Sequence, residues 1–360
     1  MRLIFTVTND LSFDQRMQRI CRTLANDGHD VTLVGFVKSW SIPLVEEPFG
    51  QKRLNLFFRK GKLFFIEYNL RLFLWMLFRG VDAICSIDLD TLAAGYAAAR
   101  IRRKPLVFDA HEFYTELPEV VGRGFVGPIW RALERFLLPK VKHNFTVSRT
   151  IADALEQRYG QPFRVLPNYP LRSETPAGEH EGYILYQGTL NTGRGLEALM
   201  EAGETLRMPI RIAGEGDLSK ELRARAASRG ADQVEFLGYL TPEALRKETQ
   251  TAWLGFNLLE NRGLSYYYSL ANKFFDYLQA GLPQLAPDFP EYRRINERWE
   301  VAVLIDEPDP RKIAKAVQAL REDPARWARM RANCLKAREV LCWENLEPEI
   351  LQFYRNLKYD

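Results

Sequence analysis

Short apolar segments alternate with longer amphipathic segments along the first half of the chain, and this alternation restricts the possible folds more than any other feature. The apolar segments are typical of buried strands and cover residues 2–7, 30–36, 81–88, 104–111 and 143–148. The segment between the first two is typical of a helix, with a capping box of Ser12 and Gln15 at its start and Gly28 at its end. Strands that alternate with helices predict a parallel sheet with helices on both faces.

The same alternation restarts after a segment rich in Pro, Gly and Glu at residues 167–182. That segment has no hydrophobic periodicity and is the best candidate for a linker between two domains. Strand-like segments begin again at residue 183, and each is followed by a helix-like segment. A length of 360 residues is also typical of about two domains. The sequence therefore predicts two α/β domains of similar design.

The composition is that of an ordinary globular protein, with 46% hydrophobic and 27% charged residues. Residues 1–170 carry a net charge of about +7 and the remainder about −3, which suits contact of the first half with anionic lipid or an anionic substrate. No nucleic-acid-binding motif accompanies these charges, so we expect no nucleic-acid partner. The four scattered cysteines form no zinc or disulfide pattern, and no signal peptide is visible. We therefore expect cytoplasmic residence.

Residues 54–78 are rich in Phe and Leu but contain five charged residues. These charges exclude a simple membrane span. Two interpretations remain open. The segment forms a buried strand and helix of the first domain, or its helix also rests on a membrane surface, which would make the protein peripheral on the inner face of the membrane.

Three ionisable residues, Asp109, His111 and Glu112, gather at the end of the strand-like segment 104–111. Ligands of open α/β sheets bind at the carboxyl ends of the strands. A histidine at this place can donate a hydrogen bond to a substrate hydroxyl or carbonyl. Alternatively, His111 only packs within its loop. We predict that these three residues form the catalytic group.

Glycine-punctuated turns follow the strands of the second domain. Gly188, Gly193 and Arg194 belong to the first turn, whose backbone N–H groups and arginine suit a phosphate or diphosphate. A purely structural loop is the alternative. Gly214 and Glu215 stand at the end of the next strand. The sequence is equally compatible with a ligand that approaches the backbone closely at this place and with a plain turn from strand to helix.

A short helix is predicted within residues 269–281, with Asn272 as its N-cap and Gly281 at its end. Backbone amides at its start would be free to bind an anion, and they belong to Ser269, Leu270, Ala271 and Asn272. Asp276 lies one turn further along, among aromatic residues, within reach of hydroxyl groups on the same ligand. A phosphate on the amides and a ribose on the carboxylate would be chemically matched.

Asp88 and Asp90 have the spacing of a pair of acids that hold a divalent metal. A capped turn from strand to helix, with Asp90 or Thr91 at the N-cap, explains this segment better. We expect no metal site.

Five segments, taken in order, resemble the nucleotide-sugar-dependent glycosyltransferases of the large retaining family 4. They are "DAHE" (109–112), "GTLNTGRGLEAL" (188–199), "AGEGD" (213–217), "VEFLGYL" (234–240) and "NKFFDYLQAGLP" (272–283). The resemblance covers most of the chain and implies the α/β GT-B fold, in which two Rossmann-like domains face each other across a cleft. It implies an acceptor-binding domain at 1–170, a terminal helix at 344–360 that crosses back onto it, and a donor-binding domain at 180–342. Gly238, Tyr239 and Leu240 would then cradle the base of the donor.

The chain departs from the family pattern at three positions of the donor-binding domain. The family usually carries two glutamates eight positions apart, and here Tyr268 replaces the first while Asp276 replaces the second, which implies that Asp276 binds ribose. The family often has a pair of phosphate-binding cations. Only Arg194 is retained, since Thr189 stands at the other position, and the neighbouring Lys273 is the residue that could compensate.

The resemblance implies an enzyme that transfers a hexose from a UDP- or GDP-linked sugar, with retention of the anomeric configuration. The acceptor would be a glycan or a lipid-linked molecule in cell-envelope polysaccharide synthesis. No metal or other cofactor is expected, because Arg194 and backbone amides would cover the charge of the diphosphate. His111 would contact the sugar, and Glu112 would be the nucleophile only in a covalent route. Two alternatives are a nucleotide-sugar epimerase of the same fold and a catalytically idle, nucleotide-binding partner protein.

Overall fold

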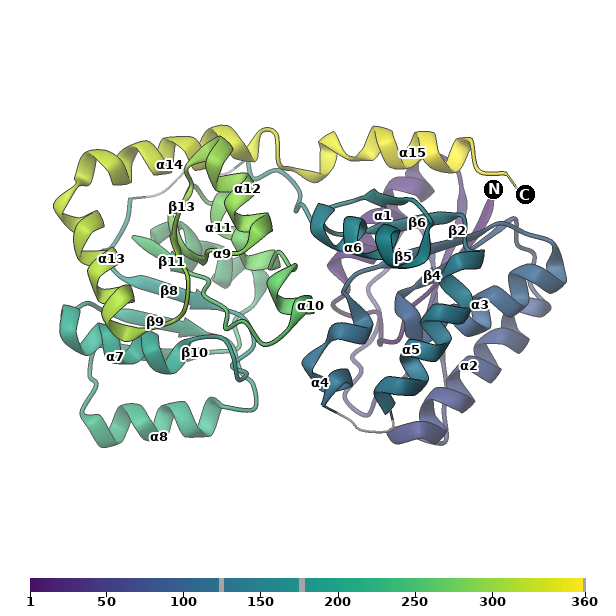
Figure 1. Ribbon diagram of the computed structural model, residues 1–360, viewed down its shortest axis with the longest axis horizontal. Coiled ribbons are helices and arrows are strands. Elements are labelled where there is room, and N and C mark those ends of the chain that lie inside the picture. Colours follow the sequence, from purple (N-terminus) through teal and green to yellow (C-terminus); the bar gives the residue numbers. More distant parts are fainter. Residues whose placement is uncertain (123–125, 175–178, 359–360) are drawn as a thin grey trace. The chain divides into compact units, whose positions relative to one another are not determined.

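The computed structural model describes residues 1–122, 126–174 and 179–358, and the chain divides into two compact units. Unit 1 comprises Met1–Asn168 and Leu346–Asp360, and unit 2 comprises Tyr169–Asn345. Each unit is built on one parallel sheet with helices packed against it (Figure 1). The chain passes from unit 1 to unit 2 within the segment predicted as a linker, of which residues 175–178 lie outside the described residues.

The sheet of unit 1 has seven strands in the order β3-β2-β1-β4-β5-β6-β7. The strands are β1 (Arg2–Thr6), β2 (Asp30–Phe36), β3 (Gly50–Leu54), β4 (Ala83–Ile87), β5 (Leu106–Ala110), β6 (His143–Thr146) and β7 (Phe163–Val165). The helices are α1 (Gln15–Asn26), α2 (Gly61–Leu77), α3 (Asp88–Arg102), α4 (Pro118–Val121), α5 (Val126–Leu137), α6 (Arg149–Tyr159) and α15 (Glu347–Arg355). Two short 3-10 turns are η1 (Tyr114–Glu116) and η2 (Leu138–Lys140).

Side chains of the central strands alternate between two apolar layers, because successive residues of a strand point to opposite faces. Ile4 and Ile84 pack in the layer that contains α2 and α3. Phe5 and Cys85 lie on the other face, where they contact Tyr354 of α15. Burial on both faces explains why these strands read as continuous apolar segments rather than as alternating ones.

Helix α15 joins unit 1 although it follows all of unit 2 in the sequence. Its Tyr354 is almost fully buried, and the Tyr354 hydroxyl lies 3.3 Å from Cys85 Sγ. Arg355 pairs with Asp27, and Glu347 accepts a hydrogen bond of 2.6 Å from the hydroxyl of Thr23. The last helix is therefore an integral part of the layer that also contains α1 (Figure 1).

The sheet of unit 2 has six strands in the order β10-β9-β8-β11-β12-β13. The strands are β8 (Ile184–Gln187), β9 (Ile210–Ala213), β10 (Val234–Gly238), β11 (Leu254–Phe256), β12 (Gln284–Pro287) and β13 (Ala302–Ile305). The helices are α7 (Leu196–Leu206), α8 (Ser219–Arg229), α9 (Pro242–Thr251), α10 (Leu264–Tyr267), α11 (Asn272–Gln279), α12 (Pro290–Trp299), α13 (Pro310–Glu322) and α14 (Pro324–Arg338), and η3 (Trp343–Asn345) is a 3-10 turn.

Three helix starts differ from the predictions. Helix α1 is capped by Asp14, which accepts from the N–H of Met17, whereas the Ser12 hydroxyl bonds Asp10 instead. Helix α11 has Ala271 as its N-cap, so the prediction for Asn272 was wrong by one residue. Gly281, with a φ of 72°, follows its end as predicted.

Helix α3 begins at Asp88, directly after strand β4, so neither Asp90 nor Thr91 is its N-cap. The Asp88 side chain is instead held by a contact from outside the helix, since it accepts a hydrogen bond from the N–H of His111. The Thr91 hydroxyl donates to the carbonyl of Ile87. The prediction of a capped turn at Asp90 or Thr91 was therefore wrong.

The Phe- and Leu-rich segment 54–78 forms the end of β3, a loop and helix α2. Tyr68, Leu72 and Met76 of α2 are buried against the sheet of unit 1. In the described part of the chain, no helix combines the length and the apolar character that a membrane crossing needs.

Candidate functional site

A buried ion pair lies at the carboxyl edge of the unit 1 sheet. Asp109, the fourth residue of β5, receives two guanidinium nitrogens of Arg16 from α1 at 3.0 Å and 3.2 Å. Arg16 also donates to the carbonyl of Leu166 and to the side chain of Asn168. Burial opposes ionisation, but Arg16 and His111 outweigh it and lower the pKa of Asp109 to about 2. These two cations favour the ionised form of Asp109, which in turn holds the Arg16 and His111 side chains in place.

Arg16 was not predicted as a site residue. It occupies a core-facing position of α1 beside Met17, and its side chain is 95% buried. A charged residue at an apolar helix position is a signal that the sequence offered, because such residues are rarely buried without a partner.

His111 is fixed by two carboxylates. Its Nε2 lies 3.3 Å from Asp109 Oδ2, and its backbone N–H donates to Asp88 Oδ1 at 2.8 Å. Burial lowers the pKa of a histidine, but the Asp109 carboxylate reverses this effect and raises the pKa of His111 above its usual value. The ring is largely but not fully enclosed, so it retains a face from which it can donate a hydrogen bond.

Three further acids lie near Asp109 and His111 in sequence or in space, and their surroundings differ: Asp88, Asp90 and Glu112. Burial raises the pKa of Asp88, and burial with the nearby Asp88 carboxylate raises the pKa of Asp90 to about 8. Burial and the neighbouring Asp88 carboxylate thus both favour the protonated form of Asp90. Glu112 is exposed on the loop that follows β5. Among the described residues, no three His, Cys, Asp or Glu side chains are grouped as metal ligands.

Two glycine turns cross at the carboxyl edge of the unit 2 sheet. Gly188 follows β8 and Gly214 follows β9, and a Cβ atom on Gly214 would lie 1.9 Å from the carbonyl oxygen of Gly188. Gly214 has a φ of 140°, which a residue with a side chain rarely adopts. The N–H of Gly188 donates to Ala213, and the N–H of Gly214 donates to Gly238. The predicted glycines of three strand ends therefore meet in one place.

Two cations lie against this glycine turn. Lys273 Nζ, from the first turn of α11, lies 3.4 Å from the position that a Cβ atom on Gly188 would take and 3.9 Å from the ring centre of Tyr186. The Arg194 guanidinium lies over the ring of Tyr266, and Arg194 Nε is buried without a hydrogen-bond partner in the described chain. Burial, together with the nearby charge of Arg194, lowers the pKa of Lys273 well below its usual range. An unpaired lysine in the first turn of a helix is electrostatically unfavourable, so the arrangement suits an anionic ligand.

Asp276 is directed at the same sheet edge by a hydrogen-bond chain. Its Oδ2 accepts from Gln187 Nε2 at 3.1 Å, and Gln187 Oε1 accepts from the hydroxyl of Thr249 at 2.8 Å. Gln187 is the last residue of β8 and is buried. It was not predicted as a site residue, although a polar side chain at the end of an apolar strand was visible in the sequence.

Two of the backbone amides that were predicted to be free at the start of α11 already donate hydrogen bonds within the protein. The N–H of Ser269 donates to Tyr266, and the N–H of Ala271 donates to the hydroxyl of Tyr292 at 2.9 Å. The prediction of free amides at Ser269 and Ala271 was therefore wrong. Leu270 is partly buried and packs against the aromatic cluster around Phe274.

Other predicted donor residues are placed around the glycine turns. Glu215 is paired with Arg223 of α8 at 2.6 Å, and its hydrogen bonds with Arg223 and Ser219 lower the pKa of Glu215 to about 2. Tyr239 is exposed after β10, whereas Leu240 packs on the apolar layer that contains Tyr183. A Cβ atom on Gly193 would lie 3.0 Å from Cδ of Arg262, a nearby cation that was not predicted and that pairs with Glu260.

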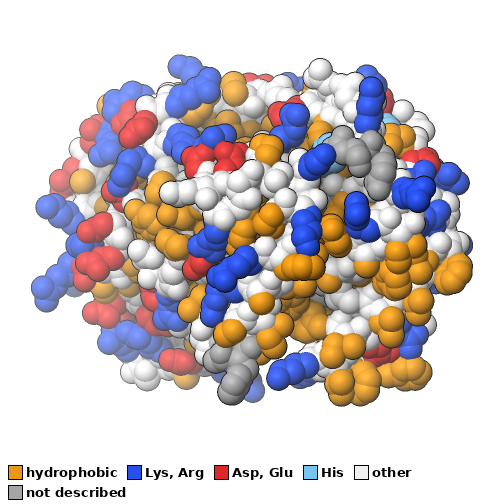
Figure 2. Space-filling view, turned by 45° about the vertical axis from the view of Figure 1, so that its right-hand side comes forward, with side chains coloured by type: hydrophobic (Ala, Val, Ile, Leu, Met, Phe, Trp, Pro, Cys, Tyr) orange, Lys and Arg blue, Asp and Glu red, His pale blue; other side chains and the backbone are white. Residues whose placement is uncertain are grey.

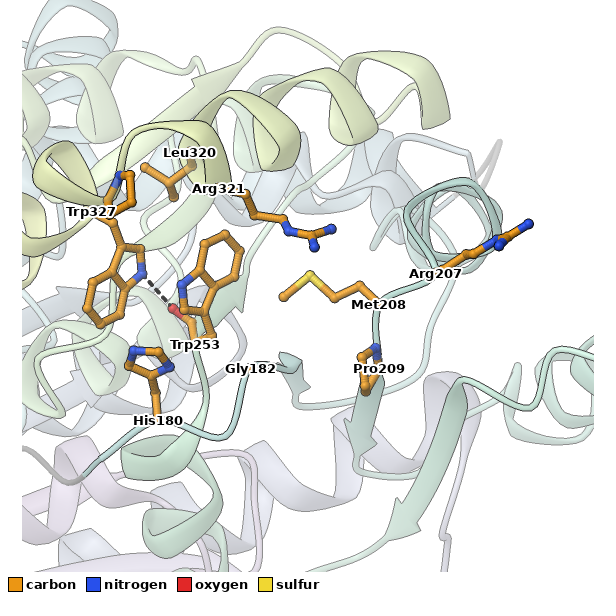
Figure 3. Close-up of a pocket in the computed structure, with 10 residues that line it drawn as sticks. His180, Gly182, Arg207, Met208, Pro209, Trp253, Leu320, Arg321 and Trp327 are labelled. Carbon is orange, nitrogen blue, oxygen red and sulfur yellow. Dashed lines mark hydrogen bonds between the residues drawn. The ribbon is translucent and has the colours of Figure 1, made fainter.

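A separate hollow of about 440 Å³ lies at the opposite edge of the unit 2 sheet. Its lining residues come from the segments that precede strands β8, β9 and β11 and from helices α13 and α14, and none of them was predicted to bind the donor. Figure 3 shows the indoles of Trp253 and Trp327 beside His180, with Met208 across the hollow. Trp327 Nε1 donates to the carbonyl of Trp253 at 2.9 Å. This hollow is distinct from the edge that holds Lys273 and Asp276.

Two family models match adjacent parts of the chain. Residues 15–169 match "Glycosyltransferase Family 4", and residues 170–337 match "Glycosyl transferases group 1". The O-antigen chain mannosyltransferase C of Escherichia coli is 36% identical over 63 residues, which cover 18% of this chain and 17% of that protein. The chain thus matches only about a sixth of the length of this curated relative.

Solved structures share the fold at low sequence identity. Sucrose-phosphate synthase from Thermosynechococcus elongatus superposes with a TM-score of 0.79 at 16% identity, over 99% of this chain and 98% of that one. HepE from Anabaena in complex with UDP superposes with a TM-score of 0.76 at 14% identity, over 99% of this chain and all of that one. Since the two family models together account for residues 15–337, and both units have Rossmann-like parallel sheets, the chain is a glycosyltransferase of the family 4 type with the GT-B fold.

Proposed function

We propose that this enzyme transfers a hexose from a UDP- or GDP-linked sugar to a glycan or lipid-linked acceptor, with retention of the anomeric configuration. The single observation that carries the donor proposal is the grouping of Arg194, Lys273 and Asp276 at one sheet edge of unit 2, beside the Gly188–Gly214 crossing. Cations and close backbone approach suit a diphosphate, and a carboxylate suits a ribose diol. HepE has been solved in complexes with UDP and with UDP-glucose, which supports a nucleotide-sugar donor here.

In the proposed site, Lys273 supplies the positive charge that is missing because Thr189 stands at one of the family's two cation positions. Its Nζ lies against Gly188, the residue next to Thr189 in the chain. Arg194 supplies the second positive charge from the other end of the same loop. With both cations on the leaving diphosphate, the reaction needs no metal ion, and activity is expected to persist when divalent cations are chelated.

In the proposed reaction, the bond between the anomeric carbon and the diphosphate oxygen breaks, and a bond from the acceptor oxygen forms on the same face of the sugar. The departing phosphate oxygen takes the proton of the acceptor hydroxyl, so no protein carboxylate is consumed. His111 donates a hydrogen bond to the transferred sugar, and Asp109 positions His111 while itself remaining ionised. Glu112 has no covalent role in this route.

The acceptor proposal is a glycan or a lipid-linked molecule of the cell envelope. The basic character of residues 1–170 supports an anionic or membrane-bound acceptor. The name of the Escherichia coli relative, an O-antigen chain mannosyltransferase, points to the same class of product. Four buried, unpaired cysteines fit the reducing conditions of the cytoplasm, where nucleotide sugars would be met.

The proposal is tested by thermal-shift titration with UDP, GDP, ADP and their common sugar conjugates, first with a chelator and then with magnesium. A ligand that binds only the folded state raises the melting temperature by mass action. We expect a selective shift with one nucleotide, independent of magnesium. Turnover is then followed by nucleotide release and by the anomeric signal of the product in NMR. An inverted anomer would contradict retention, and interconversion of the sugar without stoichiometric nucleotide release would indicate an epimerase.

A further inference from the structure

Helix α2 presents two apolar faces, of which only one is covered by unit 1. Phe64, Tyr68, Leu72 and Met76 form the buried face. A second row recurs at helical spacing on the exposed side and consists of Leu63, Ile66, Leu70, Leu74 and Phe78, whose exposed fractions range from 44% to 84%. The row extends from the first turn of the helix to the residue directly after it.

The second row is unusual for a helix on a protein surface. Such helices normally direct polar or charged residues to water. From residue 63 to residue 78, every residue of the α2 segment that is classed as exposed is apolar. Isolated exposed apolar residues need no explanation, but a continuous row of large ones marks an interaction surface.

The loop before α2 enlarges the row. Phe57 and Phe58 are exposed, and their N–H groups donate to the carboxylate of Glu67 at 2.8–3.0 Å. The Arg71 guanidinium lies 5.0 Å from the ring centre of Phe57 and pairs with Glu67 at 2.8 Å. These contacts hold the Phe57 ring over the helix, so loop and helix form one surface, which we call the α2 surface (Phe57, Phe58 and residues 63, 66, 70, 74 and 78).

The charges around the α2 surface are almost all positive. Residues 54–79 contain five Arg and Lys and one acid, Glu67, which is already engaged by Arg71. Arg59, Lys60 and Lys62 cluster at the start of the helix and form no ion pair within the described ranges. On the face displayed in Figure 2, hydrophobic side chains gather at the lower right together with Lys and Arg side chains.

We propose that the α2 surface docks on an anionic lipid bilayer, with the helix lying in the interface plane. The apolar row would enter the boundary between headgroups and acyl chains, while the cations at the start of α2 would bind lipid phosphates. Charge complementarity selects this occupant, because a free cluster of cations beside an apolar row suits an anionic interface. The docking goes beyond glycosyl transfer and requires neither donor nor acceptor.

Flotation of the full chain with vesicles tests the proposal at roughly physiological salt. We expect binding to vesicles of phosphatidylcholine mixed with phosphatidylglycerol, and much weaker binding to phosphatidylcholine alone. The triple substitution Ile66→Ser/Leu70→Ser/Leu74→Ser should lower the partition coefficient at least ~10-fold, because it removes most of the inserted apolar area. Lys60→Gln/Lys62→Gln should lower binding to the mixed vesicles by roughly 10- to 30-fold and weaken its salt dependence.

Leu171→Ser is the matched control, since Leu171 has nearly the same exposed fraction as Leu70 but belongs to unit 2. It should bind vesicles like the unchanged protein. The nucleotide-induced thermal shift should be the same in all variants, which separates this proposal from the proposed donor site. Absence of vesicle binding would overturn the proposal. So would a dimer in light scattering that the triple substitution dissociates, because the α2 surface would then join two copies of the chain.

Discussion

Lys273 and Gly188 are in near contact: the lysine Nζ lies 3.4 Å from the point that a Cβ atom on Gly188 would occupy. The two residues come from different elements, Lys273 from the first turn of α11 and Gly188 from the turn after β8. Burial lowers the pKa of Lys273 well below its usual value, and an anion beside its Nζ would favour the protonated form. If the donor diphosphate binds at Lys273 as proposed, its binding should be coupled to proton uptake by the lysine.

Lys273→Met should therefore have opposite effects on stability and on ligand binding. The unfolded lysine binds a proton below a pKa of 10.5, whereas burial disfavours the protonated form in the folded protein. The native lysine therefore destabilises the empty protein at every pH below 10.5, and most strongly below its lowered pKa. The variant should melt at a higher temperature at neutral pH without ligand, and its gain should shrink as the pH approaches 10.5. Its affinity for the selected nucleoside diphosphate should fall about 10-fold or more.

Calorimetry in buffers of different ionisation enthalpy provides the second measurement for Lys273. The unchanged protein should take up protons when the diphosphate binds, and Lys273→Met should not. An identical proton uptake in both proteins would refute this role.

Arg194→Ala should weaken diphosphate binding and reduce turnover. The Arg194 guanidinium has a buried Nε without a hydrogen-bond partner in the described chain, which a phosphate oxygen would satisfy. We expect a loss of about 10- to 100-fold in kcat/KM for the donor, because a charge-assisted hydrogen bond is lost. Arg229→Ala, which removes an exposed arginine paired with Glu204, is the control and should leave kcat/KM unchanged. Unchanged kinetics of Arg194→Ala would exclude a phosphate role.

Asp276→Ala should remove the preference for ribose over deoxyribose. If Asp276 accepts hydrogen bonds from the ribose diol, the unchanged enzyme should bind the nucleotide about 10-fold more tightly than its 2′-deoxy analogue. The variant should bind both with the lower affinity. Gln187→Ala should have a smaller effect in the same direction, because Gln187 only orients Asp276. Equal discrimination in Asp276→Ala and the unchanged enzyme would place the ribose elsewhere.

The contribution of His111 to stability should depend on pH. Its folded-state pKa is raised by Asp109, so the stabilisation is fully present below the unfolded pKa of about 6.5 and is lost as the pH rises through the folded pKa. The difference in melting temperature between the unchanged protein and His111→Gln should be largest near pH 6 and should shrink toward alkaline pH. Each unit by which the folded pKa exceeds 6.5 is worth about 1.4 kcal/mol. A difference that is constant from pH 6 to 9 would argue against a charged pair with Asp109.

Arg16→Met should destabilise unit 1 strongly. The substitution leaves the Asp109 carboxylate buried without its main partner, which costs about 3–5 kcal/mol in comparable pairs. Chemical denaturation followed by circular dichroism measures the loss. The double variant Arg16→Met/Asp109→Leu should recover part of it, because no unpaired charge remains. A double variant that is less stable than Arg16→Met would show that packing, not the charge, is what matters at this place.

The sequence predicted the strands of the two sheets more accurately than it predicted the hydrogen bonds between side chains that are far apart in the chain. Buried parallel strands such as β4 need only a short apolar run, and the strand-like segment predicted at residues 81–88 contains all of β4. The strand ends of the candidate site were also found, since glycines and acids follow them. Arg16 and Gln187 were missed because their partners lie 93 and 89 residues away, and no local pattern encodes such a separation.

The predicted N-cap residues were wrong for a related reason. Asn272 is a better cap than Ala271 by intrinsic preference, but the N–H of Ala271 is held by Tyr292, which is 21 residues further along the chain. Asp88 likewise serves His111 rather than its own helix. In both cases a tertiary hydrogen bond replaced the local one that the sequence suggested.

The position of Tyr354 against Phe5 and Cys85 has a consequence for how the protein is made. During synthesis the seven strands of unit 1 emerge first, but the helix that covers Phe5 and Cys85 follows only after all of unit 2. The nascent unit therefore lacks part of the cover of this apolar layer while the ribosome translates the second unit. Chaperones that bind apolar surface have their target during this interval, and a circularly permuted chain that begins with α15 would shorten it.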